Sequence, residues 1–194
     1  MQNGVTVRII SGSARGRKLG SFSGQGIRPT PDRVREAVFS MLFSRLGGCD
    51  GARVLDLFAG SGAMSLEALS RGAVHATLVD QDRKAERLIR ANLEHCQLAD
   101  RARILRRPVA AALDEMRGGN PFTIVFLDPP YSRNLVEPTL AALIAGRLLE
   151  KNAIVVAESD RQDQPCIPPE GLERIEERLF GRTRIELFQP LDVT

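Results

Sequence analysis

The chain has 194 residues, of which 43% are hydrophobic and 26% charged, and it carries a formal net charge of +3. This length and composition are typical of one globular domain with a small extension, and they exclude a disordered or fibrous chain. No apolar run approaches the ~20 residues of a membrane-spanning helix, and the N-terminus lacks a signal-peptide pattern, so we expect a cytoplasmic protein.

Cysteine and histidine are too few and too scattered for a metal or disulfide framework. The three cysteines lie far apart without a CxxC pair, and there are two histidines. The sequence therefore predicts no disulfide framework and no metal site.

Positive charge is concentrated at the start of the chain. Residues 1–35 contain seven basic residues and one acidic residue, a net +6, so the remainder sums to −3. Nearly all basic residues are arginines, which bind phosphates through two hydrogen bonds and stack on bases. A basic, glycine-rich leading segment indicates a nucleic-acid partner, and the alternative is an arm that only aids solubility.

In chain order, residues 5–10 and 18–22 are predicted as short strands joined by a turn of small residues, a β-hairpin. After a glycine-rich loop, Thr30-Pro31 predicts the N-cap and first position of a helix. The apolar residues on or near one face of that helix are Val34, Val38, Met41, Leu42 and Phe43.

From residue 52 onward, strands and helices alternate, which is typical of a mostly parallel sheet covered by helices on both faces. The end of the chain differs, because two consecutive strands around Gly181-Arg182 predict an antiparallel hairpin at the sheet edge. The predicted strands cover residues 53–58, 77–80, 103–105, 123–127, 153–158, 174–180 and 183–188. The predicted helices cover residues 61–71, 82–95, 109–116 and 135–149.

A glycine-rich turn follows the first strand of the alternating region, in the sequence Asp56-Leu57-Phe58-Ala59-Gly60-Ser61-Gly62. Glycines let the backbone approach a ligand, and Asp80 at the end of the next strand can accept hydrogen bonds from ribose hydroxyls. Any adenosine-bearing cofactor suits this pattern. NAD fits less well than S-adenosylmethionine, because Ser65 replaces the third glycine and Asp56 would repel a pyrophosphate. The alternative is a tight turn that needs glycine for packing only.

A second motif, Asp128-Pro129-Pro130-Tyr131, ends a strand of four apolar residues. The prolines fix the backbone and donate no hydrogen bond, so Asp128 and the Pro129 carbonyl can act as fixed acceptors beside a flat ring. Two acceptors and a ring suit a nucleobase with an exocyclic amino group, and the alternative is a rigid loop without chemistry. If the two motif-bearing strands are neighbours, cofactor and base share one crevice at the carboxyl edge of the sheet.

At these residues the chain resembles the class I S-adenosylmethionine-dependent methyltransferases. Within them it is similar to the RsmD family, which methylates N2 of a guanine in bacterial 16S ribosomal RNA. The resemblance covers almost the whole chain and is most specific in Arg28-Pro29-Thr30-Pro31-Asp32-Arg33-Val34-Arg35-Glu36. It implies a Rossmann-like domain over residues 30–194, with a seven-stranded, mostly parallel sheet and an antiparallel C-terminal hairpin, and a basic hairpin extension over residues 1–29.

The resemblance also implies a site and partners. Asp128, Pro129, Pro130 and Tyr131 would hold the guanine of small-subunit ribosomal RNA, within an assembling subunit, with no metal and no membrane. The residues expected to hold S-adenosylmethionine are Thr30, Asp56, Phe58, Ala59, Gly60, Ser61, Gly62, Asp80, Gln81 and Pro108. The residues expected to bind RNA are Arg15, Arg17, Lys18, Arg28 and Arg33.

One segment departs from the class pattern. Many members have an acid after the third strand that contacts adenine, where this chain has Arg106-Arg107-Pro108, so backbone atoms there are expected to recognise the ring. Three other functions stay open: a DNA adenine-N6 methyltransferase, a nicotinamide-dependent oxidoreductase, and a non-catalytic RNA-binding module with a degenerate cofactor site.

Overall fold

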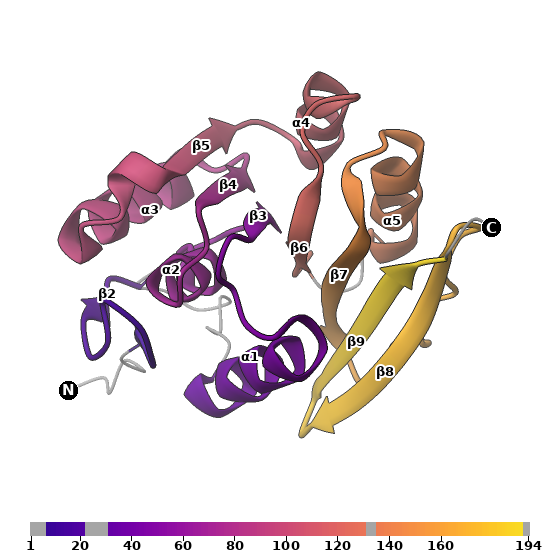
Figure 1. The fold of residues 1–194 in the computed structure, drawn as a ribbon, viewed down its shortest axis with the longest axis horizontal. Coiled ribbons are helices and arrows are strands. Elements are labelled where there is room, and N and C mark those ends of the chain that lie inside the picture. Colours follow the sequence, from indigo (N-terminus) through magenta and orange to yellow (C-terminus); the bar gives the residue numbers. More distant parts are fainter. Residues whose placement is uncertain (1–6, 22–30, 131–134, 192–194) are drawn as a thin grey trace.

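The computed structural model of the chain describes residues 7–21, 31–130 and 135–191. Its parallel strands are β3 (Arg53–Leu57), β4 (His75–Asp80), β5 (Ala102–Arg106), β6 (Phe122–Leu127) and β7 (Leu149–Asp160). The C-terminal pair, β8 (Leu172–Phe180) and β9 (Thr183–Pro190), is antiparallel and joins the sheet through β7. Together they form one seven-stranded sheet in the order β5-β4-β3-β6-β7-β9-β8 (Figure 1). The predicted fold class is confirmed.

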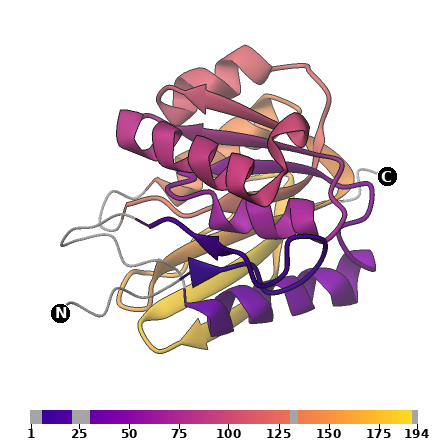
Figure 2. The same cartoon turned by 90° about the vertical axis from the view of Figure 1, so that its left-hand side faces the viewer.

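Helices cover both faces of this sheet (Figure 2). One face packs against α1 (Asp32–Leu46), α2 (Ala63–Ser70) and α3 (Arg83–Cys96), and the other against α4 (Val109–Met116) and α5 (Val136–Ala145). A short 3₁₀ turn, Ala99–Arg101, links α3 to β5. Because both faces are covered, β3 and β6 are buried along almost their whole length and do not alternate between buried and exposed residues.

The strand order reverses at β3. From β3 the chain moves outward through β4 to β5, then returns to place β6 on the other side of β3. In open parallel sheets, ligands bind at the carboxyl ends of the strands where this reversal occurs. The fold therefore sets a binding crevice at the carboxyl ends of β3 and β6.

The N-terminal hairpin consists of β1 (Val7–Arg8) and β2 (Lys18–Leu19), and the predicted ends at residues 5, 6 and 22 lie outside the described residues. The hairpin packs on α2 through its turn. The Ile10 and Ser11 amides donate to the carboxylate of Glu67 at 2.7 and 3.0 Å. Gly12 sits so close to α2 that a Cβ there would lie 1.8 Å from the Ser70 carbonyl oxygen. The hairpin is thereby fixed to the α/β body.

Asn92 of α3 links the hairpin to the glycine-rich turn. Its buried amide accepts a hydrogen bond from the Gly20 N–H at 2.8 Å and donates to the Gly20 carbonyl at 3.2 Å. The same nitrogen donates to the Ser61 carbonyl at 3.0 Å. One side chain thus holds both segments in place.

The first helix differs from its prediction in detail. Its N-cap is Pro31, whereas the predicted cap, Thr30, lies outside the described residues. Phe43 is 66% exposed, while Phe39 packs in the core. Arg35 is fully buried, and its side chain donates to the Arg8 carbonyl and to Asp32.

Two boundaries of other helices also differ. The helix predicted from residue 61 begins at Ala63, because Gly62 adopts the left-handed conformation at its N-cap. The helix predicted to reach residue 149 ends at Ala145, because Arg147 is also left-handed and β7 starts at Leu149.

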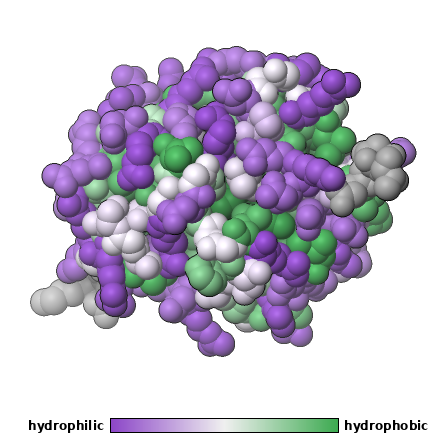
Figure 3. Space-filling model, viewed as in Figure 1, coloured by the Kyte–Doolittle hydropathy of each residue, from purple (hydrophilic) through white to green (hydrophobic). Residues whose placement is uncertain are grey.

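Polar and charged side chains cover much of the face seen in Figure 3, with smaller hydrophobic areas between them. Within the described part of the chain, no helix is both long enough and apolar enough to cross a bilayer.

Candidate active site

The turn after β3 has an unusual backbone. Phe58, Gly60 and Gly62 all have positive φ angles, of 65°, 55° and 78°. This region is uncommon for a residue with a side chain, and such strain clusters at ligand sites. The side of Gly60 where a Cβ would lie is open, with the nearest atom 3.9 Å away, whereas a Cβ at Gly62 would meet Leu66 at 2.9 Å. Gly60 therefore leaves room for a ligand, and Gly62 has a packing role.

Asp80 supports this turn from the end of β4. One carboxylate oxygen accepts the Gly60 N–H and the other accepts the Asp82 N–H, both at 2.9 Å. Each oxygen keeps a second lone pair, which suits a ribose hydroxyl. Pro108, the N-cap of α4, comes to the same edge because the Arg107 amide donates to the Asp80 carbonyl at 3.1 Å.

Asp56 lies beneath the turn and is only 4% exposed. Its Oδ2 accepts the hydroxyl of Ser65 at 2.9 Å and the Ser65 N–H at 3.3 Å. Burial raises the pKa of Asp56 to about 7, with Asp80 adding to the rise and the Ser65 bonds opposing it. A cation placed above the turn would favour the charged form of Asp56. In the sequence, Ser65 is notable only because it stands where a dinucleotide-binding motif has its third glycine. Its hydrogen bonds to Asp56 are seen only in the structure.

The second motif lies at the same edge, as predicted. Leu57 and Leu127 are register partners in the parallel pair β3–β6, so Asp128 follows directly beside the turn. Pro129 is buried and Pro130 exposed, and Tyr131 lies outside the described residues. The side chain of Asp128 is exposed, yet its pKa is raised well above the ordinary value. The largest cause is that the surrounding protein limits the hydration of the carboxylate, and the carboxylates of Glu158 and Asp56 add to the rise.

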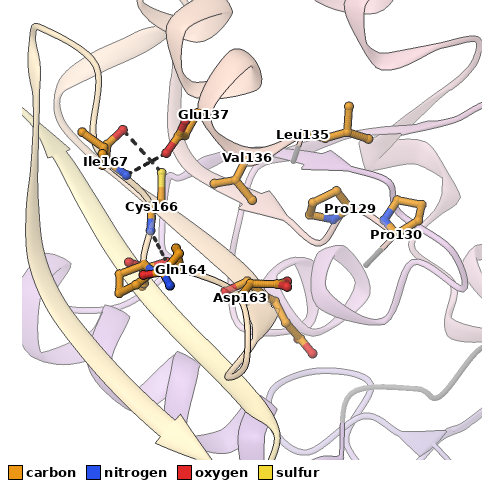
Figure 4. Close-up of a pocket in the computed structure, with 13 residues that line it drawn as sticks. Pro129, Pro130, Leu135, Val136, Glu137, Asp163, Gln164, Cys166 and Ile167 are labelled. Carbon is orange, nitrogen blue, oxygen red and sulfur yellow. Dashed lines mark hydrogen bonds between the residues drawn. The ribbon is translucent and has the colours of Figure 1, made fainter. Parts of the chain in front are cut away.

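A pocket of about 280 Å³ adjoins this motif on the side of β7 and α5 (Figure 4). Its walls come from the Pro129-Pro130 corner, the start of α5, the end of β7 and the segment leading to β8. Glu158 and Ser159 contribute from β7. The sequence analysis did not select them, although an acid at the carboxyl end of a strand was a usable signal.

The remaining predicted cofactor positions follow the two strands. Ala59 and Ser61 are half-buried in the turn, and Gln81 is exposed after β4. Among the described residues, no group of three or more His, Cys, Asp or Glu side chains is placed to hold a metal ion. The cysteines Cys49, Cys96 and Cys166 are buried and unpaired.

The predicted RNA-binding residues divide into two groups. Arg15, Lys18 and Arg33 are exposed, and within residues 7–21, 31–130 and 135–191 their side chains have no hydrogen bond or ion pair. Arg17 instead donates to the His95 carbonyl and to the side chain of Gln97 at the end of α3. Arg28 lies outside the described residues.

A cluster of arginines between residues 101 and 107 makes its contacts within the protein. Arg103 and Arg107 both pair with Glu115 of α4, and Arg106 pairs with Glu86 of α3. Its arginines therefore have protein partners at the surface.

The model of the family described as "Conserved hypothetical protein 95" matches residues 7–189. Curated relatives named ribosomal RNA small subunit methyltransferase D are 38% identical in Escherichia coli strain K12 and 34% identical in Haemophilus influenzae. Each alignment covers 94% of this chain, with 89% of the first relative and 93% of the second. The chain belongs to the RsmD family. The solved structure of the Escherichia coli protein yhhF is 37% identical, with a TM-score of 0.83 over 95% of this chain and 98% of that one.

The family match confirms the resemblance drawn from the sequence, and the curated relatives in the RsmD family are named as methyltransferases. The crevice between the β3 turn and the Asp128 corner is therefore the candidate active site of an RsmD-family fold.

Proposed function

We propose that the protein transfers a methyl group from S-adenosylmethionine to the N2 amino group of a guanine in small-subunit ribosomal RNA. The observation that carries the proposal is the parallel pairing of β3 with β6, which brings the glycine-rich turn and the Asp128-Pro129-Pro130 corner to one edge. The names of the RsmD relatives support the RNA substrate. Location in the cytoplasm and action on an assembling subunit belong to the same proposal.

The residues of the turn fit this cofactor. The buried carboxylate of Asp56 suits a cationic ligand and disfavours a pyrophosphate, and the open side of Gly60 leaves space for it. Asp80 would hold the ribose, and the backbone at Arg107-Pro108 would face the adenine. S-adenosylmethionine supplies, when bound, an electrophilic methyl group on a sulfonium.

The Asp128 corner would position the nucleophile. An aromatic amine is a weak nucleophile because its lone pair is delocalised into the ring. Hydrogen bonds from the amino group to Asp128 and to the Pro129 carbonyl would favour a nitrogen whose lone pair points at the methyl group, and positioning supplies much of the rate. The nitrogen would form a bond to the methyl carbon as the carbon–sulfur bond breaks and its electron pair stays on sulfur. The nitrogen would then lose one proton, which Asp128 or water accepts. The base must leave its stack to reach the crevice, where Tyr131 would stack on it.

The test uses labelled S-adenosylmethionine and small ribosomal subunits that lack the modification. Wild-type protein should label the RNA at one guanine, and mapping identifies it. Asp128→Ala should bind the cofactor as wild type does, while methyl transfer falls by at least about a hundredfold, because the amino group loses its acceptor. Cofactor affinity by calorimetry and single-turnover rates give the two readouts.

Three outcomes would contradict the proposal. Unchanged turnover in Asp128→Ala would remove Asp128 from the mechanism. Labelling of DNA instead of subunits would favour an adenine methyltransferase. RNA binding without affinity for the cofactor would favour a non-catalytic module.

A further inference from the structure

The end of β7 lies beside the Asp128 corner, on the side away from the glycine-rich turn. Leu127 and Ala157 are register partners in the parallel pair β6–β7, so Asp128 and Glu158 follow at the same edge. The strand order places β3 on one side of β6 and β7 on the other. A base held by its amino group at Asp128, with the cofactor over β3, therefore has to extend towards β7.

The pocket beside the corner lies where such a base would extend. The Pro129 and Pro130 rings line it (Figure 4), and so do Glu158 and Ser159 of β7. The Ser159 hydroxyl is buried and finds no hydrogen-bond partner in the described part of the chain. Buried polar groups are normally paired, so this hydroxyl indicates a pocket suited to a partly polar guest.

Two further acids of the pocket hold the segment between β7 and β8. Glu137 accepts the Ile167 N–H at 3.0 Å, as the close-up shows (Figure 4). Glu186 accepts the Cys166 N–H at 3.4 Å and pairs with Arg174 at 2.7 Å. These contacts hold the segment between β7 and β8 against the pocket.

Glu158 is the acid placed next to Asp128. The two residues follow register partners of neighbouring parallel strands, so they lie side by side at one edge of the sheet, and the Glu158 carboxylate is one of the charges that raise the pKa of Asp128. Two adjacent carboxylates can accept two adjacent hydrogen-bond donors.

We propose that Glu158 accepts the N1–H of the target guanine and thereby determines the choice of guanine over other purines. The inference rests on the proposed function and adds the residue that reads the base. In guanine the N1–H lies next to the N2 amino group, so Asp128 and Glu158 can each accept one hydrogen. Adenine has an unprotonated N1 beside its amino group, and a carboxylate repels that lone pair. Enzymes that extrude a base commonly read this Watson–Crick edge.

The test replaces the mapped guanine with 2-aminopurine, which keeps the amino group but has an unprotonated N1. Wild-type protein should methylate this RNA with kcat/KM at least about tenfold below that for guanine, because the Glu158 carboxylate then faces a lone pair. Glu158→Gln offers both a donor and an acceptor at this position. The guanine rate should fall, the 2-aminopurine rate should rise, and the preference should drop by at least about tenfold.

The ratio of the two rates separates reading of N1 from a general electrostatic effect, which would change both rates equally. Asp163→Asn is the matched control, since Asp163 lines the same pocket on an exposed segment and should leave the ratio unchanged. Glu158→Asp keeps the charge but shortens the reach, so it should slow guanine methylation without a gain on 2-aminopurine.

Equal rates of wild type on both bases, or an unchanged ratio in Glu158→Gln, would overturn the role of Glu158. Guanine methylation by wild-type protein would then still support the proposed function. Absence of any guanine methylation by wild type would overturn the proposed function itself and this inference with it.

Discussion

Asp56 and Asp128 are carboxyl groups that the fold places where the charged form is disfavoured. Loss of hydration is the largest cause for both, through burial at Asp56 and through the protein around the exposed Asp128, and each pKa is also raised by another carboxylate at the same edge of the sheet. Placing a carboxylate where it is poorly hydrated lowers the stability of the fold, and a bound ligand can offset this loss. A cation near Asp56 and amino hydrogens at Asp128 would stabilise the charged carboxylates in place of water.

The raised pKa of Asp56 predicts that the stability of the fold depends on pH. The pKa is about 7 in the folded protein and about 4 in an unfolded chain. The folded protein therefore holds an extra proton between these values, and the free energy of unfolding falls as the pH rises through this window. Asp56→Asn keeps an acceptor for Ser65 but does not titrate. Without cofactor, it should melt on the order of 5 °C above wild type at about pH 8, and this difference should vanish near pH 4.

Thermal unfolding at several pH values measures this difference. Asp100→Asn, at an exposed position, should show little difference at any pH. Equal melting temperatures of wild type and Asp56→Asn at about pH 8 would show that the buried carboxylate carries no such penalty.

Asp128 predicts the pH dependence of methyl transfer. Its charged form is the stronger hydrogen-bond acceptor and the form that can take up the released proton, so the rate should rise with pH as the carboxyl loses its proton. Because the pKa of Asp128 is raised, this rise should lie clearly above the range near pH 4 of an ordinary aspartate. Single-turnover rates at saturating cofactor measure the profile, and Asp128→Asn should flatten it. A rate that is constant down to about pH 5 would contradict the assignment.

At the scale of elements, the N-terminal hairpin and α2 act as one unit. The carboxylate of Glu67 accepts two hairpin amides and also pairs with Arg71 at 2.7 Å, while it is itself fully buried. The hairpin also contributes Val7, Ile9 and Leu19 to the core under α1 and α2. A basic extension held in this way presents its exposed arginines in a defined orientation.

Gly12 tests this attachment. Its φ is +83°, and an added methyl group would overlap the Ser70 carbonyl. Gly16 has the same φ of +83° but nothing within 4 Å of the added atom. Gly16→Ala should therefore cost only the backbone strain of about 1 kcal/mol, whereas Gly12→Ala should lower the free energy of unfolding by more, about 2–4 kcal/mol. Denaturant unfolding of both variants measures the difference, and equal losses would mean that the hairpin does not need this close contact.

At the scale of the whole molecule, positive charge is divided between contact with RNA and contact with the protein itself. Arg15 projects into solvent, whereas Arg17 joins the hairpin to the end of α3. Neighbouring arginines of one hairpin therefore have different predicted roles, which sequence reasoning placed in one group.

Substitution of each arginine separates these roles. Arg15→Ala should weaken RNA binding about equally for all sequences and lower the slope of log affinity against log salt by about 0.7–0.9, without a change in melting temperature. Arg17→Ala should lower the melting temperature, because two hydrogen bonds to α3 are lost. Binding titrations at several salt concentrations and thermal unfolding provide the measurements. An unchanged salt slope in Arg15→Ala would place the RNA elsewhere.

The sequence predicted the sheet well because apolar strands and turn residues are local signals. The pairing of β3 with β6 entered the sequence reasoning only as a condition, because alternating strands and helices predict a parallel sheet but not its strand order, and the structure shows this pairing. The roles of Ser65 and Arg35 could not be predicted, because each depends on a contact with another element of the fold. Arg35 shows this most clearly, since nothing in a helix sequence marks an arginine that becomes fully buried against the hairpin.

The three hydrogen bonds of Asn92 have a consequence for how freely this chain can vary. Most positions on an amphipathic helix accept any residue of suitable polarity, but this one needs a donor and an acceptor at one fixed reach. Aspartate would lack the donor, glutamine would be one methylene too long, and leucine would leave Gly20 and Ser61 without their partner. A residue remote from the chemistry is thereby as constrained as one that takes part in it.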